Sequence, residues 1–149
     1  DWNTITTGNV FTCDISPIVS TPTKWPLIQV YINNGTVDLM WSQRSADIFL
    51  GLPYDIVMYG LLLELIAKGN NLKPGKLIGQ LGDCHLYNNH LQQARQYRLR
   101  SKRALPKIEL VRGVNANVLG GVNIPHPSDI KLINYNPYPA IKAELSVGK

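Results

Sequence analysis

The chain has 149 residues, of which 44% are hydrophobic and 17% charged, and its formal net charge at pH 7 is +5. This length suits one domain with a sizeable core, and the composition excludes a disordered chain. The positive charge favours an anionic partner such as a nucleotide, but it does not fix the fold. Two cysteines, Cys13 and Cys84, are too few for a disulfide framework or a metal cluster, so we expect no metal and a reducing compartment.

The longest apolar run and the start of the chain bear on its location. Residues 56–67 form that run, which is too short to cross a bilayer and contains Glu64. No signal peptide is visible, and we expect a cytoplasmic protein without a membrane partner. Because the first residue is Asp1 and not Met, we interpret the chain as a fragment, a processed product or an incompletely assigned sequence.

The first third of the chain predicts strands. Residues 4–11 contain β-branched side chains and indicate one strand, whereas the prolines of residues 16–26 indicate an irregular connection. The apolar residues 27–32 and the alternating residues 36–43 indicate two further strands. The Asn-Gly pair between them is a strong hairpin signal, because both residues tolerate positive φ.

Pro53 begins the main predicted helix, which runs to about Lys68. This helix is apolar nearly all round, so we expect it to be central and buried. Pro74-Gly75 then predicts a turn. The remaining predicted elements are a strand at 76–87, a helix at 88–97, and strands at 107–111 and 130–135. The order indicates an α+β fold, with helices packed on one side of a largely antiparallel sheet.

Residues 43–55 read Gln-Arg-Ser-Ala-Asp-Ile-Phe-Leu-Gly-Leu-Pro-Tyr-Asp. This run resembles the signature segment of the thymidylate synthase and deoxycytidylate (dCMP) hydroxymethylase family. The resemblance implies that Arg44 and Ser45 bind the nucleotide 5′-phosphate, for which a guanidinium fork and a hydroxyl are suited. It also implies that Asp47 bonds the pterin ring of folate, with Gly51 beside the same pocket. Without the resemblance, Asp47 would be interpreted as a turn or cap carboxylate ahead of the helix.

Asp55 ends this segment and bears on which base is bound. Thymidylate synthases have Asn at the matching position, and family members that act on cytosine nucleotides have Asp. A carboxyl group can accept from N4 of cytosine and, when protonated, donate to N3, whereas an amide suits uracil. The resemblance therefore implies dCMP in preference to dUMP. The alternative is that Asp55 only complements the dipole at the helix start.

The second motif, residues 82–90, reproduces every fixed residue of the family pattern Gly-Asp-x-His-x-Tyr-x-Asn-His. On a strand, His85 and Tyr87 point to one face. The resemblance implies that these two hold the deoxyribose 3′-hydroxyl and that Asp83 belongs to a polar network of the site. Cys84 would point to the opposite face, and we expect it to be a small core residue.

The third motif, residues 135–143, resembles the family's Asn-Pro-His-Pro segment before Ile-Lys, with Tyr138 in place of the His. In the family, the tail after this motif folds over the bound ligands, and Val147 matches its last residue. Gln29 also matches a family residue, one that lies beside the base of the nucleotide.

The nucleophile of the family is missing from its matching position. The family's thiolate lies five residues before the Gln matched by Gln29, and Lys24, an amine that is no equivalent, stands there. Cys13 is the remaining candidate, if a loop rearrangement brings it in. The N-terminal phosphate-binding Arg is absent too. We therefore divide the chain into a divergent segment, 1–26, and a thymidylate synthase-like C-terminal domain, 27–149.

The resemblance implies a dCMP hydroxymethylase-type protein that transfers a one-carbon unit from 5,10-methylenetetrahydrofolate to C5 of dCMP, as a fragment or divergent form. The alternative is a catalytically inactive relative with a regulatory or structural role. It further implies dimerisation through the sheet, as a homodimer or with a partner chain that supplies the missing N-terminal part, and by analogy a phage gene. The basic stretch 95–107 indicates a solvated connection, and nucleic acid is the lowest-ranked partner.

Overall fold

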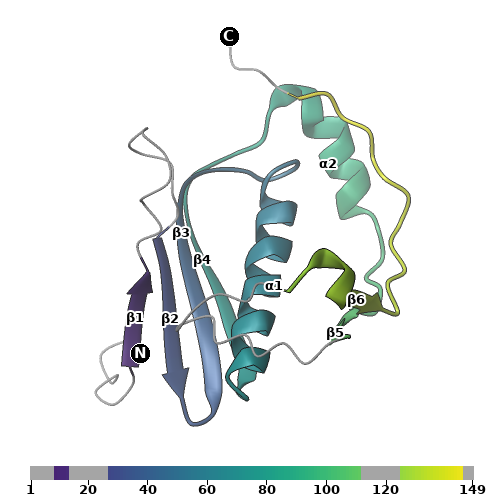
Figure 1. The fold of residues 1–149 in the computed structure, drawn as a ribbon. Coiled ribbons are helices and arrows are strands. Elements are labelled where there is room, and N and C mark those ends of the chain that lie inside the picture. Colours follow the sequence, from purple (N-terminus) through teal and green to yellow (C-terminus); the bar gives the residue numbers. More distant parts are fainter. Residues whose placement is uncertain (1–8, 14–26, 112–124, 146–149) are drawn as a thin grey trace.

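The computed structural model describes residues 9–13, 27–111 and 125–145 (Figure 1). Its main sheet has the strand order β1-β2-β3-β4. The strands are β1 (Asn9–Cys13), β2 (Leu27–Asn33), β3 (Thr36–Asp47) and β4 (Lys73–His85). The predicted first strand thus lies partly within β1, while residues 4–8 and the predicted connection 16–26 are outside the described residues.

The main sheet is mixed. β1 pairs with β2 and β2 with β3 in antiparallel fashion, but β3 and β4 are parallel and are joined by helix α1 (Leu52–Gly69). Parallel neighbours need such a crossover connection. The α+β class is confirmed, and antiparallel pairing predominates among the described strands. The parallel β3–β4 pair was not predicted.

The hairpin between β2 and β3 forms as predicted. Asn34 and Gly35 have φ values of 47° and 75°, and Asn33 pairs with Thr36 across the turn. β3 continues four residues beyond its predicted end at Gln43, to Asp47. The first part of the signature segment therefore lies on a strand of the sheet.

The predicted turn at Pro74-Gly75 is wrong, because both residues belong to β4. The register of β4 against β3 is irregular there, between Val37 and Leu39. Asp38 spans the irregularity, since its Oδ1 accepts a hydrogen bond of 2.6 Å from the backbone N–H of Lys76. An unpaired strand residue is typical of a β-bulge, and Pro and Gly are tolerated at such points.

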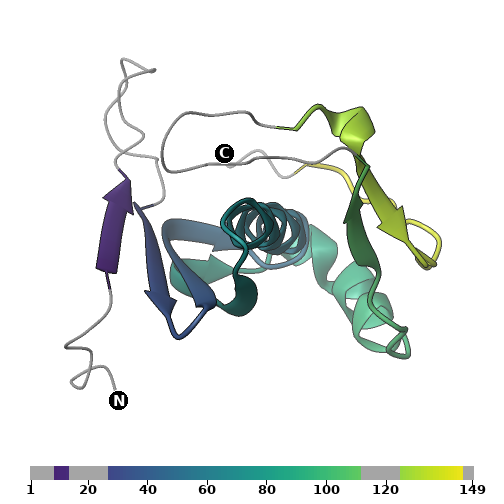
Figure 2. The same ribbon diagram turned by 60° about the horizontal axis from the view of Figure 1, so that its bottom comes forward.

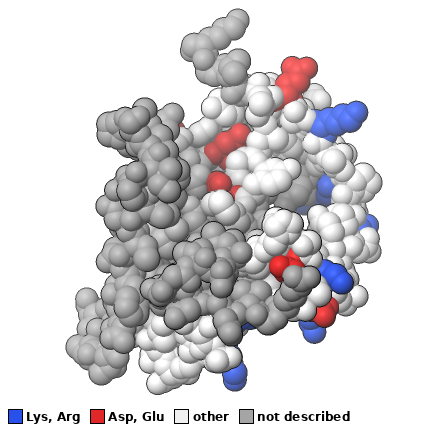
Figure 3. Space-filling model, viewed as in Figure 1, with Lys and Arg blue, Asp and Glu red and all other residues white. Residues whose placement is uncertain are grey.

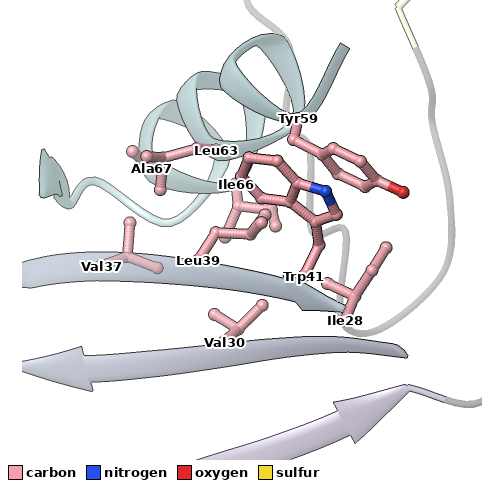
Figure 4. Packing of buried hydrophobic residues seen from close by; sticks show 9 residues of the cluster. All are labelled: Ile28, Val30, Val37, Leu39, Trp41, Tyr59, Leu63, Ile66 and Ala67. Carbon is pink, nitrogen blue, oxygen red and sulfur yellow. The ribbon is translucent and has the colours of Figure 1, made fainter. Parts of the chain in front are cut away.

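Helix α1 packs on one face of the main sheet, chiefly over β3 and β4, and its core also includes side chains of β2 (Figure 4). The buried cluster comprises Ile28, Val30, Val37, Leu39, Trp41, Tyr59, Leu63, Ile66 and Ala67. The rings of Trp41 and Tyr59 stack with their centroids 4.7 Å apart. Alternating residues of β3 enter this core, as predicted.

The prediction that α1 is buried all round is wrong. Its C-terminal half is buried, but its first two turns expose Tyr54, Ile56, Val57 and Met58, with Tyr54 77% exposed. The reason is visible in Figure 2, where the described sheet lies against one side of the helix. No helix in the described part of the chain is long and apolar enough to cross a membrane.

The described residues after β4 form a smaller unit beside the main sheet (Figures 1 and 2). A single 3₁₀ turn, η2 (Asn88–His90), leads into helix α2 (Leu91–Arg98), close to the predicted helix. β5 (Lys107–Leu110) and β6 (Ile130–Ile133) pair antiparallel, with η3 (Pro127–Asp129) before β6. Residues 134–145, which we call the tail, then run back along α2 (Figure 1).

Two arginines of the basic stretch hold this tail, so the stretch is not simply a solvated connection. Arg103 donates to the carbonyls of Asn136 and Pro137, and its guanidinium carbon lies 3.6 Å from the centroid of the Tyr138 ring. Arg100 donates to the carbonyl of Pro139 at 2.6 Å. On the face shown in Figure 3, the described basic side chains lie scattered along the edge.

Candidate functional site

The parallel pairing of β3 and β4 brings the first two motifs together. In the register of the sheet, Ser45 lies opposite Asp83, and Asp47 lies opposite His85. The backbone N–H of Ile48 continues the ladder with a 3.0 Å bond to the carbonyl of His85. Both strands end here, and the carboxyl ends of parallel strands are a frequent place for ligands in α/β sheets.

Ser45, Asp83 and His85 form a small polar group. The hydroxyl of Ser45 lies 3.4 Å from Oδ2 of Asp83, and the same carboxylate lies 3.5 Å from Nδ1 of His85. Arg44 does not join them, because strand alternation directs its side chain to the opposite face from Ser45. The structure therefore unites one of the two predicted phosphate ligands with Asp83 and His85, but not the pair.

His85 and Tyr87, the two predicted sugar ligands, are in contact. Their ring centroids lie 5.0 Å apart with the planes nearly perpendicular. Tyr87 follows the end of β4, so the contact arises from the chain leaving the sheet and not from two residues of one strand. The prediction that Cys84 is a core residue is wrong, since its thiol is exposed on the edge strand β4.

Asp47 shapes the connection from β3 to α1. Its Oδ1 accepts hydrogen bonds from the backbone N–H groups of Phe49, at 3.0 Å, and Leu50, at 3.3 Å. Its carbonyl accepts a 3.1 Å bond from Gly51, and a Cβ at Gly51 would lie 3.3 Å from that oxygen. These bonds are typical of a carboxylate that stabilises a turn. The role of Asp47 in binding folate stays a prediction.

Asp55 lies in the first turn of α1 and is tied to β3. Its Oδ2 accepts a 2.9 Å hydrogen bond from Nε2 of Gln43, which also donates to the carbonyl of Ser45 at 3.0 Å. Oε1 of the same amide accepts from Nε1 of Trp41 at 3.2 Å. Because an indole N–H can only donate and a carbonyl can only accept, the amide orientation is fixed.

Gln43 is a site residue that the sequence analysis missed. The available signal was strand alternation, which places Gln43 on the core face, two residues after Trp41. Tyr59 lies one turn after Asp55 on α1, and its ring stacks on that of Trp41. Burial, and secondly the Asp55 carboxylate, raise the pKa of Tyr59 above its ordinary value. Asp55 itself is half-buried, so this end of the site is only partly open to solvent.

Gln29 and Cys13 lie away from this group. Gln29 sits between the buried Ile28 and Val30 on β2, so alternation turns it to the sheet face opposite α1. Cys13 pairs with Ile28 at the end of β1. Lys24 lies outside the described residues. Among the described residues, no three His, Cys, Asp or Glu side chains gather in a way that would hold a metal ion.

Comparison with known proteins gives the family. The family model for thymidylate synthase matches residues 15–147. Two curated relatives, both called thymidylate synthase, come from Francisella tularensis subsp. holarctica strains FTNF002-00 / FTA and OSU18. Each is 40% identical over 121 residues, which cover 81% of this chain and 42% of the relative. The chain thus spans less than half the length of these relatives, and with nearly all of it matched it belongs to the thymidylate synthase family.

Proposed function

We propose that this chain carries the nucleotide-binding part of a pyrimidine deoxynucleotide site that prefers dCMP to dUMP, as in a dCMP hydroxymethylase. The observation that carries the proposal is the Asp55 carboxylate, held by Gln43 at the start of α1. With Oδ2 occupied by the amide of Gln43, Oδ1 is the oxygen that would meet the base. It would accept from the N4 amino group of cytosine, but it would face the O4 acceptor of uracil with an acceptor. Such a mismatch leaves buried polar groups unpaired and lowers affinity.

The phosphate and the sugar would lie at the ends of β3 and β4. His85 and Tyr87, whose rings are in contact, would bind the 3′-hydroxyl. Ser45 would donate to the phosphate. The Asp83 carboxylate beside Ser45 opposes an anion there. The guanidinium of Arg44 would therefore have to turn toward Ser45 on binding, so that its charge offsets that of Asp83.

The full reaction would be one-carbon transfer from 5,10-methylenetetrahydrofolate to C5 of dCMP, with Asp47 and Gly51 beside the folate. Lys24, at the matching position of the nucleophile, favours binding without turnover by this chain alone, and it supports an inactive relative as the alternative. A homodimer formed through the sheet, or a partner chain, would supply the missing part. The apolar side chains exposed on the first two turns of α1 support a partner chain that covers this helix.

Calorimetric titration of the chain and of Asp55→Asn with dCMP and with dUMP tests base recognition. The variant should bind dCMP more weakly and dUMP more strongly, which changes the ratio of the two affinities at least about tenfold, as expected for one buried polar mismatch. Glu109→Gln, which removes one exposed carboxylate on strand β5, is the matched control for charge. An unchanged ratio in Asp55→Asn would remove the proposed role of Asp55.

A further inference from the structure

His90 is a fully buried polar side chain for which the sequence analysis found no role. It closes the second motif, directly before helix α2. Its ring centroid lies 5.4 Å from that of Phe49 and 6.0 Å from that of Tyr87. His90 therefore touches both the signature segment and the second motif, at the point where these two meet.

The imidazole of His90 also holds the C-terminal tail. Its Nε2 lies 2.7 Å from the backbone carbonyl of Glu144, which is 54 residues further along the chain. A carbonyl oxygen only accepts, so Nε2 must carry the proton. The side-chain nitrogen of Asn89, 3.4 Å from the same ring nitrogen, is itself a donor and does not accept that proton.

The other ring nitrogen fixes this arrangement. Nδ1 of His90 is buried and has no hydrogen-bonding partner within the described residues. If Nδ1 carried the proton instead, its buried N–H would lack an acceptor and the lone pair of Nε2 would face the Glu144 carbonyl. That tautomer is less favourable than one with an unpaired lone pair on Nδ1. A side chain kept only to fill space would not need the Nε2–H at all, and an apolar ring would fill the site at lower cost.

The bond to Glu144 is the second of two anchors on the tail. Arg103 and Arg100 fix residues 136–139 farther upstream, at the end of α2 away from the site. His90 fixes the tail again beside Phe49 and Tyr87. Residues 140–143 lie between the two anchors, and Lys142 is exposed there.

We propose that His90 is a positioning residue, which fixes the tail beside the candidate nucleotide site by donating its Nε2 proton to the carbonyl of Glu144. Because the His90 ring also lies against Phe49 and Tyr87, this bond links the tail to both motifs. The anchor itself can be measured in the free chain. Its effect on the nucleotide rests on the proposed function.

Limited proteolysis with trypsin measures the anchor through cleavage after Lys142, followed by mass spectrometry. His90→Phe keeps a ring of similar shape but has no donor, and His90→Gln keeps an N–H donor. Cleavage after Lys142 should be about fivefold faster in His90→Phe, the change expected from one net hydrogen bond of about 1 kcal/mol, and closer to the parent rate in His90→Gln. His126→Phe, at an exposed histidine before η3, is the control and should leave the rate unchanged.

Cleavage at the other Lys and Arg sites separates a local effect from lost stability. If His90→Phe accelerates all sites alike, or if its cleavage after Lys142 matches the parent, the anchor is refuted. Nitrogen NMR of the parent chain gives a second measurement that needs no variant. It should find Nε2 of His90 protonated and Nδ1 unprotonated, and the opposite tautomer would overturn the proposal.

The link to the site needs a separate titration with dCMP. His90→Phe should bind dCMP about threefold or more weakly than the parent, within the range for one hydrogen bond, with His90→Gln in between. Equal affinities in the parent and His90→Phe would refute the positioning role. If the parent does not bind dCMP, the proposed function fails, while the trypsin and NMR results still decide the anchor.

Discussion

Replacing Gln43 by Met would remove the amide that joins β3 to the start of α1, while a side chain of similar length remains. In the parent chain, this amide accepts from Trp41 and donates to Asp55 and to the carbonyl of Ser45. The substitution therefore breaks three hydrogen bonds without opening a large cavity. It tests whether the amide links Trp41 in the core to Asp55.

The loss can be estimated from the exposure of each partner. Trp41 is 4% exposed, so its indole N–H would lose its acceptor in a site that water scarcely reaches. Leaving a buried donor unpaired costs about 1–3 kcal/mol. Asp55 and Ser45 are half-buried, and water can replace part of what they lose. We expect Gln43→Met to lower the free energy of unfolding by about 2 kcal/mol.

Urea unfolding followed by far-ultraviolet circular dichroism measures this change. Trp41→Phe is the partner variant, because it removes the N–H and keeps a ring over Tyr59. If the amide is the acceptor of Trp41, the double variant should lose less than the sum of the single losses, by about 1 kcal/mol. Strictly additive losses would refute the bridge from Trp41 through Gln43 to Asp55.

Three further outcomes follow from the same geometry. Burial is the main cause of the raised pKa of Tyr59. The contribution of Tyr59 to stability is therefore fully present below about pH 10 and is lost as the pH rises through its folded pKa. Urea midpoints of Tyr59→Phe should fall less steeply in alkali than those of the parent. A Cβ at Gly79 would lie 2.5 Å from the ring of Trp41, so Gly79→Ala should cost about 1–3 kcal/mol in urea unfolding, and a neutral result would contradict this contact. Arg103→Lys, which loses the planar fork over Tyr138, should destabilise by about 1 kcal/mol in the same assay, whereas equal stability would show that charge alone suffices.

Local sequence signals predicted the β2–β3 hairpin and its buried face. Asn34 and Gly35 take the positive φ values that their pairing indicated, and the alternation of Val37, Leu39 and Trp41 places one face in the core. Such features depend on neighbours within a few residues, which is why composition and period suffice for them.

Features that depend on distant partners could not be read in this way. The apolar pattern of α1 predicted burial on all sides, but a pattern does not say which elements are there to cover it. The parallel partner of β3 lies beyond α1 in the chain, and the turn signal of Pro74-Gly75 gave no sign of the bulge that Asp38 bridges.

The same limit applies to the site. The family motifs named His85, Tyr87 and Asp83, and the structure brings these together. The motifs do not say that Gln43 orients Asp55 or that His90 reaches Glu144, because each bond joins elements that only the fold makes neighbours. The predicted strand ended at Gln43, so alternation was not applied to Arg44 and Ser45, which β3 places on opposite faces.

Calorimetric titration of the unmodified chain with dCMP and with dUMP measures the base preference of the site without any substitution. We expect dCMP to bind and dUMP to bind at least about tenfold more weakly, since the Asp55 oxygen matches only the cytosine amino group. Tighter binding of dUMP, or no binding of either nucleotide, would contradict a cytosine-reading site in this chain.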